Sequence, residues 1–207
     1  MPLPIDVVIP HKPSRDWFFR RYCLPSIEAQ NPSRIIIEDG PGGACEKRNA
    51  GVLKCSSPYV FLVDDDIIVA KGHLENSVQA LEEASNKYGY TYCDWIQVPM
   101  TGCMDPPMTT AEYVHIPKFE DLPIHDHGGV DWAVVRRSAY QPFDPKVIRF
   151  QSWDWSLNML KAGYSGLKIE GFSCISFMLD RGITTGTSIE DTARMRQYVQ
   201  RKHGFIP

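Results

Sequence analysis

Short apolar runs alternate with segments of helical periodicity over the first hundred residues of the chain. Three runs are rich in β-branched residues, as buried strands are: IDVVIP (5–10), RIIIED (34–39) and YVFLVDDD (59–66). Helical spacing follows these runs in three segments: 15–30, 40–56 and 71–89. Strands that alternate with helices predict an α/β fold, with a central and mostly parallel sheet flanked by helices.

The pattern changes after the apolar segment CDWIQVPM (93–100). Residues 101–129 carry prolines, methionines and three histidines without clear periodicity, which predicts a long functional loop. The alternation then returns in three predicted elements: strand 130–140, helix 152–164 with Ser152 as its cap, and strand 166–178. We therefore expect one domain over residues 1–207.

Composition narrows the class of protein. With 207 residues and 43% hydrophobic content, the chain can bury one substantial core. A formal net charge of −3 provides no general field that would attract nucleic acid or an anionic membrane. No stretch reaches the roughly 18 apolar residues of a membrane span, and the start MPLPIDVVIPHKP lacks the layout of a signal peptide, so we expect a cytoplasmic protein.

The cysteines do not follow a metal-binding motif. Six of them are scattered along the chain: Cys23, Cys45, Cys55, Cys93, Cys103 and Cys174. Because none has CxxC spacing, the pattern argues against a zinc site or a disulfide framework and favours reduced, mostly buried thiols.

Three predicted strands end in polar or acidic residues, and ligands of open parallel sheets bind at that edge. The three ends are Pro10-His11-Lys12, Glu38-Asp39 and Asp64-Asp65-Asp66. Side chains of a strand alternate between its faces, so Asp64 and Asp66 are expected to converge while Asp65 diverges. Adjacent carboxylates raise one another's pKa unless a cation lies among them, and Mg²⁺ or Mn²⁺ would relieve this repulsion. The alternative is an acidic strand end in solvent.

Four motifs taken together resemble a known family. IDVVIPHKP, IIIEDGPGG, CEKRNAGV and YVFLVDDDII, in this order and at these spacings, look like the nucleotide-binding half of a family 2 glycosyltransferase of the GT-A fold. The resemblance is close over residues 5–75 and looser through GGVDWAVVRRSAY and WDWSLNMLKAGY. It implies that residues 1–100 bind a nucleotide sugar, and that residues 101–207, with the long loop 101–129, form the acceptor side.

The resemblance assigns several residues to the nucleotide. Asp39 would accept a hydrogen bond from the base, although it could instead cap the turn before Gly40. Arg48 would reach the base or the phosphates, or could be an exposed helical arginine. Pro10 would place its carbonyl near the base. His11 stands where the family has a small hydroxyl residue, and it could also be a surface loop residue.

Within the acidic triplet, the resemblance assigns Asp66 to Mn²⁺ or Mg²⁺. Asp64 and Asp65 would share the ribose contacts and the support of the metal, with Asp64 as a second ligand. The late histidine that some relatives use on the metal is not evident, because Asp180 and Arg181 stand near that place. Three loop histidines could bind metal, contact sugar or do neither: His115, His125 and His127.

The catalytic base is the assignment on which the sequence departs from the family. Alignment of MLKAGY with the family helix places the usual Glu-Asp pair on Gln151 and Ser152. Asp154 is the candidate base, because it follows two residues later and stands between two tryptophans. It could instead be a carboxylate that the helix dipole favours. Asp131 is the reserve candidate, as a base or as a sugar-binding residue.

The implied function is a metal-dependent, inverting transfer of a sugar from a nucleoside diphosphate sugar, with a UDP-sugar expected, to a hydroxyl acceptor. The acceptor could belong to a glycan, a lipid-linked sugar, a protein or a modified nucleic-acid base. One alternative is a nucleotidyltransferase, but PHKPSRDWF lacks the glycines of the loop that such enzymes carry. Another is a module that binds nucleotide sugars without catalysis. The basic C-terminal segment could cover the diphosphate, hold an anionic acceptor or face solvent.

Overall fold

The computed structural model describes residues 1–99, 112–114, 132–179 and 187–206. Its strands are β1 Leu3–Pro10, β2 Pro32–Glu38, β3 Tyr59–Leu62, β4 Ile67–Val69, β5 Tyr88–Pro99, β6 Glu112–Val114, β7 Val134–Arg136 and β8 Ser165–Met178. Its α-helices are α1 Asp16–Phe18, α2 Leu24–Glu28, α3 Ala44–Leu53, α4 His73–Glu83, α5 Gln151–Lys161 and α7 Ile189–Lys202. Short 3-10 turns span Pro13–Arg15 and Arg137–Ala139, and one π-helical turn, Phe19–Cys23, joins α1 to α2.

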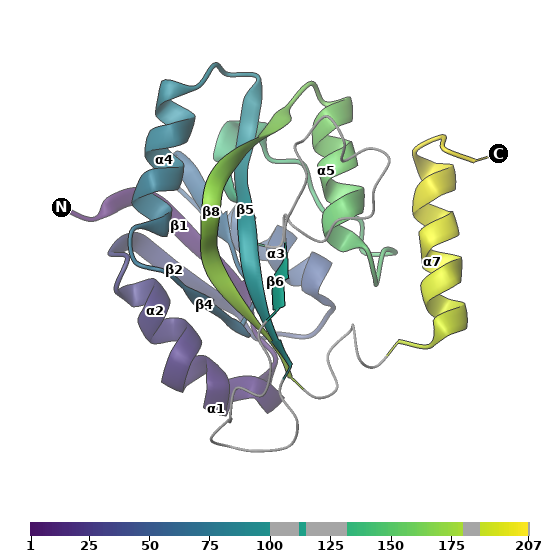
Figure 1. Ribbon diagram of the computed structural model, residues 1–207, viewed down its shortest axis with the longest axis horizontal. Coiled ribbons are helices and arrows are strands. Elements are labelled where there is room, and N and C mark those ends of the chain that lie inside the picture. The colour runs from purple at the N-terminus through teal and green to yellow at the C-terminus, as the bar shows by residue number, and fades with distance from the viewer. Residues whose placement is uncertain (100–111, 115–131, 180–186, 207) are drawn as a thin grey trace.

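All the described strands belong to one sheet with the order β2-β1-β3-β7-β5-β8-β4, and β6 pairs with β5 (Figure 1). The long strands run in one direction, because β1 pairs in parallel with β2 and β3, and β5 pairs in parallel with β8. The short strands β4, β6 and β7 run the other way. The predicted α/β fold with a mostly parallel sheet flanked by helices is confirmed.

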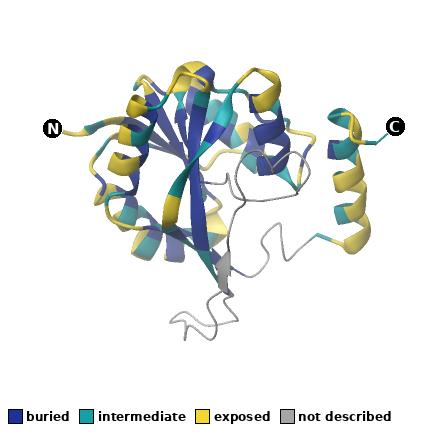
Figure 2. Ribbon diagram, turned by 45° about the horizontal axis from the view of Figure 1, so that its top comes forward, coloured by how far each residue is buried: buried dark blue, intermediate teal, exposed yellow. Residues whose placement is uncertain are grey.

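Helices cover both faces of the sheet. α3 packs on the face of β1 that carries Val8, since its Gly51 lies directly against that side chain. α4 packs on the opposite face, where the His73 ring lies 5.3 Å from that of Phe61. Trp155 of α5 contacts Tyr90 on the same face as α3. β1, β3 and most of β5 are buried between these layers, whereas β2 and β8 are partly exposed and much of α7 is exposed (Figure 2).

Two element boundaries differ from the prediction in ways that affect the site. The strand predicted over 59–66 ends at Leu62, and the acidic triplet lies in the turn before β4. The helix predicted over 15–30 begins earlier, at Pro13, and contains the π-helical turn. In both places the chain leaves regular structure next to the carboxylates. No helix in the described part of the chain is long and apolar enough to cross a membrane.

A close approach between α3 and β1 requires glycine at position 51. A Cβ atom at Gly51 would overlap the Val8 Cγ1 methyl group, and both residues are buried. We expect Gly51→Ala to lower the free energy of unfolding by about 1–3 kcal/mol, because overpacking outweighs the gain in helix propensity. Chemical denaturation measures this change.

Gly40→Ala is the matched control, since no heavy atom lies within 4 Å of a Cβ built there and its φ is not positive. Equal stability of the two variants would show that α3 does not pack as closely on β1 as described.

Candidate functional site

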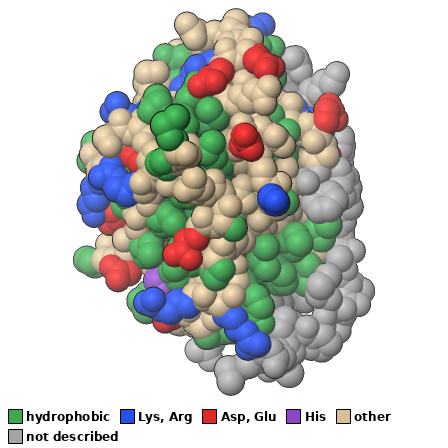
Figure 3. All heavy atoms as spheres, turned by 90° about the vertical axis from the view of Figure 1, so that its left-hand side faces the viewer, with side chains coloured by type: hydrophobic (Ala, Val, Ile, Leu, Met, Phe, Trp, Pro, Cys, Tyr) green, Lys and Arg blue, Asp and Glu red, His purple; other side chains and the backbone are tan. Residues whose placement is uncertain are grey.

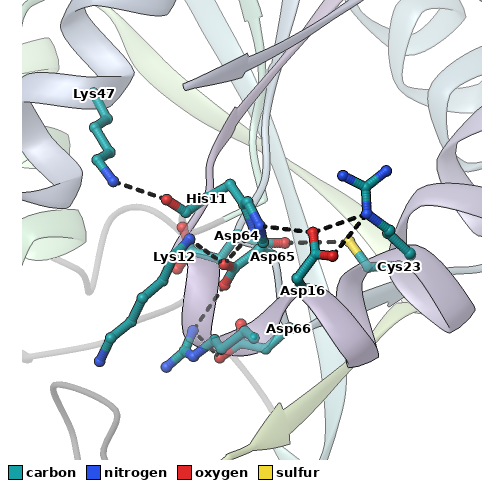
Figure 4. Close-up of polar contacts among 10 residues, drawn as sticks. His11, Lys12, Asp16, Cys23, Lys47, Asp64, Asp65 and Asp66 are labelled. Carbon is teal, nitrogen blue, oxygen red and sulfur yellow. Dashed lines mark hydrogen bonds and ion pairs between the residues drawn. The ribbon is translucent and has the colours of Figure 1, made fainter. Parts of the chain in front are cut away.

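The acidic triplet lies at the carboxyl end of β3, next to the carboxyl end of β1 (Figure 4). Asp65 is the most buried member, with 1% of its surface exposed. Its Oδ2 accepts a hydrogen bond of 2.7 Å from the Lys12 backbone N–H and lies 3.0 Å from His11 Nδ1. The carboxylate of Asp65 is therefore held from the segment that follows β1.

Arg15 joins two members of the triplet. Its Nη1 lies 2.8 Å from Asp65 Oδ1 and 2.8 Å from Asp66 Oδ2. The prediction that Asp65 diverges from Asp66 is therefore wrong, and the convergence of Asp64 with Asp66 stays a prediction. Strand alternation does not apply here, because β3 ends at Leu62 and the triplet lies in the turn between β3 and β4.

Asp66 has the most perturbed carboxyl group of the site. Burial raises its pKa from 3.8 to about 7, against the opposing effect of Arg15, and the charges of Asp64 and Asp65 raise it further. A carboxylate that ionises at such a cost is stabilised by a nearby cation. Carboxylate oxygens are the ligands that Mg²⁺ and Mn²⁺ prefer, so the residues present fit a divalent ion.

Asp64 forms an ion pair with Arg48. Arg48 Nη2 lies 2.5 Å from Asp64 Oδ1, and Nη1 donates a 2.7 Å hydrogen bond to Gln151 Oε1 at the start of α5. Arg48 is 2% exposed, so the alternative of an exposed helical arginine is wrong. Its guanidinium also lies over the Phe143 ring, and Arg48 links the acidic triplet to the start of α5.

His11 and Pro10 are buried at the end of β1, so the alternative of a surface loop residue is wrong for His11. The His11 ring lies 4.5 Å from the Phe19 ring, with Nε2 3.3 Å from Asp16 Oδ1. Its backbone carbonyl accepts a 2.8 Å hydrogen bond from Lys47 Nζ (Figure 4). His11 therefore fixes the position of Asp65 and of the β1 end.

Asp39 lies directly after β2 and is exposed, at the same edge of the sheet as the triplet. An exposed carboxylate at this edge is accessible to a ligand. Its contact with a nucleobase stays a prediction.

Asp154, the candidate base, is 1% exposed. Its Oδ1 lies 2.8 Å from both Lys202 Nζ and His203 Nε2, which come from the end of α7. Lys202 also bonds Asp144, and Asn158 donates a 3.3 Å hydrogen bond to Asp154 Oδ2. These contacts give Asp154 a structural role, since they anchor α7, and its place in the first turn of α5 fits the alternative of a carboxylate that the helix dipole favours. Its catalytic role stays a prediction.

The other assigned residues of the acceptor side lie outside the described residues. These are Asp131, the three loop histidines His115, His125 and His127, and the pair Asp180 and Arg181. Their predicted roles therefore stay predictions.

Sequence reasoning missed Arg15. Its position in a predicted amphipathic segment gave no sign of a contact with residues fifty positions away. The need for a cationic partner was predictable, because three adjacent carboxylates beside a buried strand require positive charge nearby. Arg15 and Lys12 are the basic residues that directly follow β1.

The molecular surface gives no sign of a dominant electrostatic field on the face drawn in Figure 3. Basic and acidic side chains are interspersed there among apolar and uncharged ones. This face therefore lacks the single-sign basic patch that duplex nucleic acid binding uses.

Comparisons with known proteins connect this arrangement to a fold. No protein family model matches the sequence. No curated protein matches it either. Solved structures do match, although their sequence identities to this chain are low.

Glycosyltransferases are among the matching structures. Residues 1–349 of S. aureus TarS, in complex with UDP-GlcNAc, superpose with a TM-score of 0.62 at 11% identity, over 95% of this chain and 65% of that one. The mannosyltransferase PcManGT from Pyrobaculum calidifontis, in complex with GDP-Man and Mn²⁺, gives a TM-score of 0.57 at 14% identity, over 88% of this chain and 61% of that one.

The chain thus spans less than two thirds of the length of either structure. At these identities the likeness concerns the fold alone. The sheet, the flanking helices and the polar edge described above belong to the GT-A fold, which this chain shares with these glycosyltransferases.

Proposed function

We propose that this protein is a metal-dependent, inverting glycosyltransferase of the family 2 type, which moves a sugar from a nucleoside diphosphate sugar to a hydroxyl acceptor. One observation carries the proposal: three carboxylates, one with its pKa raised to about 7, occupy the carboxyl edge of a GT-A sheet. A UDP-sugar is the proposed donor. The TarS and PcManGT structures hold UDP-GlcNAc and GDP-Man, respectively, which supports a donor of this chemical class.

The nucleotide would lie over the ends of β1 and β2. Asp39 is exposed there and would accept a hydrogen bond from the base. Pro10 and His11 form the floor at the end of β1, and Asp64, whose side chain is 30% exposed, would bind the ribose. Because Asp65 is buried, its contribution in this arrangement is to hold His11, Lys12 and Arg15 in place.

Asp66 and Asp64 would hold the Mn²⁺ or Mg²⁺ ion. Bound there, the ion would neutralise the diphosphate and stabilise it as a leaving group. Arg15 supplies a permanent positive charge next to Asp66, so it keeps the turn folded and its guanidinium is available to a phosphate.

Inverting transfer also requires a base on the face of the sugar opposite the diphosphate. The acceptor oxygen forms its bond to the anomeric carbon as the bond to the diphosphate breaks, and the base takes the hydroxyl proton. Asp154 can act in this way if α7 releases its carboxylate from Lys202 and His203. Asp131 is the second candidate. The hydroxyl acceptor belongs to a glycan, a lipid-linked sugar, a protein or a modified nucleic-acid base.

One observation favours a second candidate function, a module that binds nucleotide sugars without transferring them. Gln151 and Ser152 stand where the family has its acidic pair. The carboxylate that follows them in sequence, Asp154, is engaged by Lys202 and His203. Release of nucleoside diphosphate from a donor panel in the presence of Mn²⁺, with and without acceptors, separates the two. A transferase turns over with an acceptor, whereas a module binds donor without turnover.

Removal of the Asp66 carboxylate tests the metal assignment. We expect Asp66→Asn to abolish transfer and to abolish the Mn²⁺-dependent part of nucleoside diphosphate binding in calorimetric titration, because the ion loses its main ligand. Circular dichroism should show an unchanged fold. Asp191→Asn, on the exposed part of α7, is the control and should bind as wild type. Full activity of Asp66→Asn in excess chelator would exclude the assignment.

The same substitution should change the pH dependence of stability. The pKa of Asp66 is raised in the folded state, so ionisation destabilises the fold as pH rises from about 4 through about 7. In chelator, Asp66→Asn should therefore match wild type near pH 4 and be more stable at pH 8, by at most about 4 kcal/mol. Thermal unfolding across this pH range measures the difference. A variant that is less stable than wild type at pH 8 contradicts the raised pKa.

A pair of variants separates the two roles of Asp154. The observed contacts predict that Asp154→Asn and Lys202→Ala each cost about 1–3 kcal/mol of stability and expose α7 to protease to a similar degree. Turnover should then fall by similar factors in both. If Asp154 is the base, Asp154→Asn alone should lose about 10²–10⁴-fold in kcat with donor affinity unchanged. Lys202→Ala would keep its turnover, because it leaves the carboxylate in place.

A further inference from the structure

A second cluster of ligand-type side chains lies inside the protein, away from the carboxylate turn. It consists of His73 at the start of α4, Cys93 in β5 and Cys174 in β8. One ligand atom from each residue lies within 4.8 Å of the other two. Three separate segments of the chain thus converge where α4 packs on the sheet.

All three side chains are removed from solvent. His73 is 2% exposed, and both cysteines are 0% exposed. Neither ring nitrogen of His73 makes a hydrogen bond of normal geometry within the described residues, although the Trp132 carbonyl lies near the ring. Burial of an imidazole whose ring nitrogens make no hydrogen bond of normal geometry is costly, and a ligand on the ring would offset that cost.

The sulfur atoms of Cys93 and Cys174 lie within 4.8 Å of one another. Cys93 and Cys174 lie on neighbouring strands that pair in parallel. Their sulfurs are therefore already adjacent, on the side of the sheet that faces His73.

More unsatisfied groups belong to the same interface. Ser77 follows His73 by one helical turn, and Thr91 precedes Cys93 by two positions, so each shares a face with its neighbour. Both hydroxyls are buried and have no hydrogen-bond partner in the described part of the chain. The interface between α4 and β5 thus contains several polar atoms that the described protein groups do not satisfy.

We propose that His73, Cys93 and Cys174 bind a zinc ion that holds α4 against the sheet. Thiolate and imidazole ligands in this combination suit Zn²⁺, which is bound by Cys and His with bonds of about 2.0–2.3 Å. Tetrahedral bonds of that length place ligand atoms roughly 3.5–3.8 Å apart, so shifts of about 1 Å complete the set. A neighbouring hydroxyl or a water molecule would supply the fourth ligand.

The combined charge of the three ligands favours Zn²⁺ at this buried site. Two thiolates and a neutral imidazole carry two negative charges, which Zn²⁺ cancels, and a neutral complex avoids the cost of burying net charge. Cu⁺ with the same ligands would leave one negative charge in the core. Binding releases the two thiol protons to solvent, and no electron is transferred.

This site is independent of the proposed transferase function. The carboxylate turn offers oxygen ligands for a hard ion, whereas the cluster offers sulfur and nitrogen ligands for a softer one. The absence of CxxC spacing in the sequence argued against zinc. That spacing identifies only sites whose ligands are close together in sequence. Here the fold, and not a motif, assembles the ligands.

Metal analysis of the full-length protein tests the proposal. Protein expressed with zinc supplementation and purified under reducing conditions should retain stoichiometric zinc after dialysis. Asp66→Asn should retain the same amount, while Cys93→Ser and Cys174→Ser should lose it. Cys55→Ser, which changes a different buried free cysteine, is the matched control and should keep the zinc.

Cobalt substitution gives a readout that does not depend on the variants folding. Wild-type protein prepared with Co²⁺ should show a thiolate-to-cobalt charge-transfer band and intense tetrahedral d–d bands, both absent from Cys174→Ser. Wild-type protein that holds no zinc and shows no such band overturns the proposal. A disulfide between Cys93 and Cys174 in the protein as purified, or wild-type zinc content in Cys174→Ser, overturns it equally.

Discussion

The concentration of negative charge after β3 is the constraint on which the rest of the site depends. Three adjacent carboxylates beside a buried strand repel one another and lose hydration, so the turn can fold only with cations close by. Arg15 supplies one positive charge to Asp65 and Asp66, and Arg48 supplies another to Asp64. The balance remains incomplete at Asp66, whose pKa stays raised to about 7. Ionised Asp66 destabilises the folded protein when no cation is bound, so a bound cation there stabilises the fold.

The same contacts organise the molecule around the turn. Arg48 continues from Asp64 to Gln151 and thereby fixes the start of α5 relative to the end of β3. Phe150, directly before α5, adopts a left-handed conformation with a φ of 64°, which is uncommon for a bulky residue. Asp154 then connects α5 to α7 through Lys202 and His203. Helices α5 and α7 are therefore positioned by a chain of polar contacts that begins at the acidic triplet.

The sequence predicted the fold, and it placed the polar ends of β1, β2 and β3 at one edge of the sheet, because both features depend on local pattern. Strand and helix periodicities, together with polar strand ends at one edge, were sufficient for that. The end of β3 at Leu62 was not predictable from the sequence. The residues around the three aspartates would be the same whether the aspartates continued the strand or formed a turn. The partners of Arg15 and Asp154 come from distant segments, so no local pattern could reveal them. The convergence of His73, Cys93 and Cys174 likewise depends on three-dimensional packing alone.

The central claim is that the carboxylate turn is a divalent cation site at which a nucleoside diphosphate binds. Paramagnetic broadening by Mn²⁺ in amide-detected NMR locates such an ion directly. If the ion binds at the acidic triplet, substoichiometric Mn²⁺ should broaden the amide signals of residues 64–66 and 11–15 first. A chelator should reverse this broadening, and a nucleoside diphosphate should strengthen it. Broadening centred elsewhere in the chain, or signals at the turn that Mn²⁺ leaves unchanged in the presence of the diphosphate, would contradict the account.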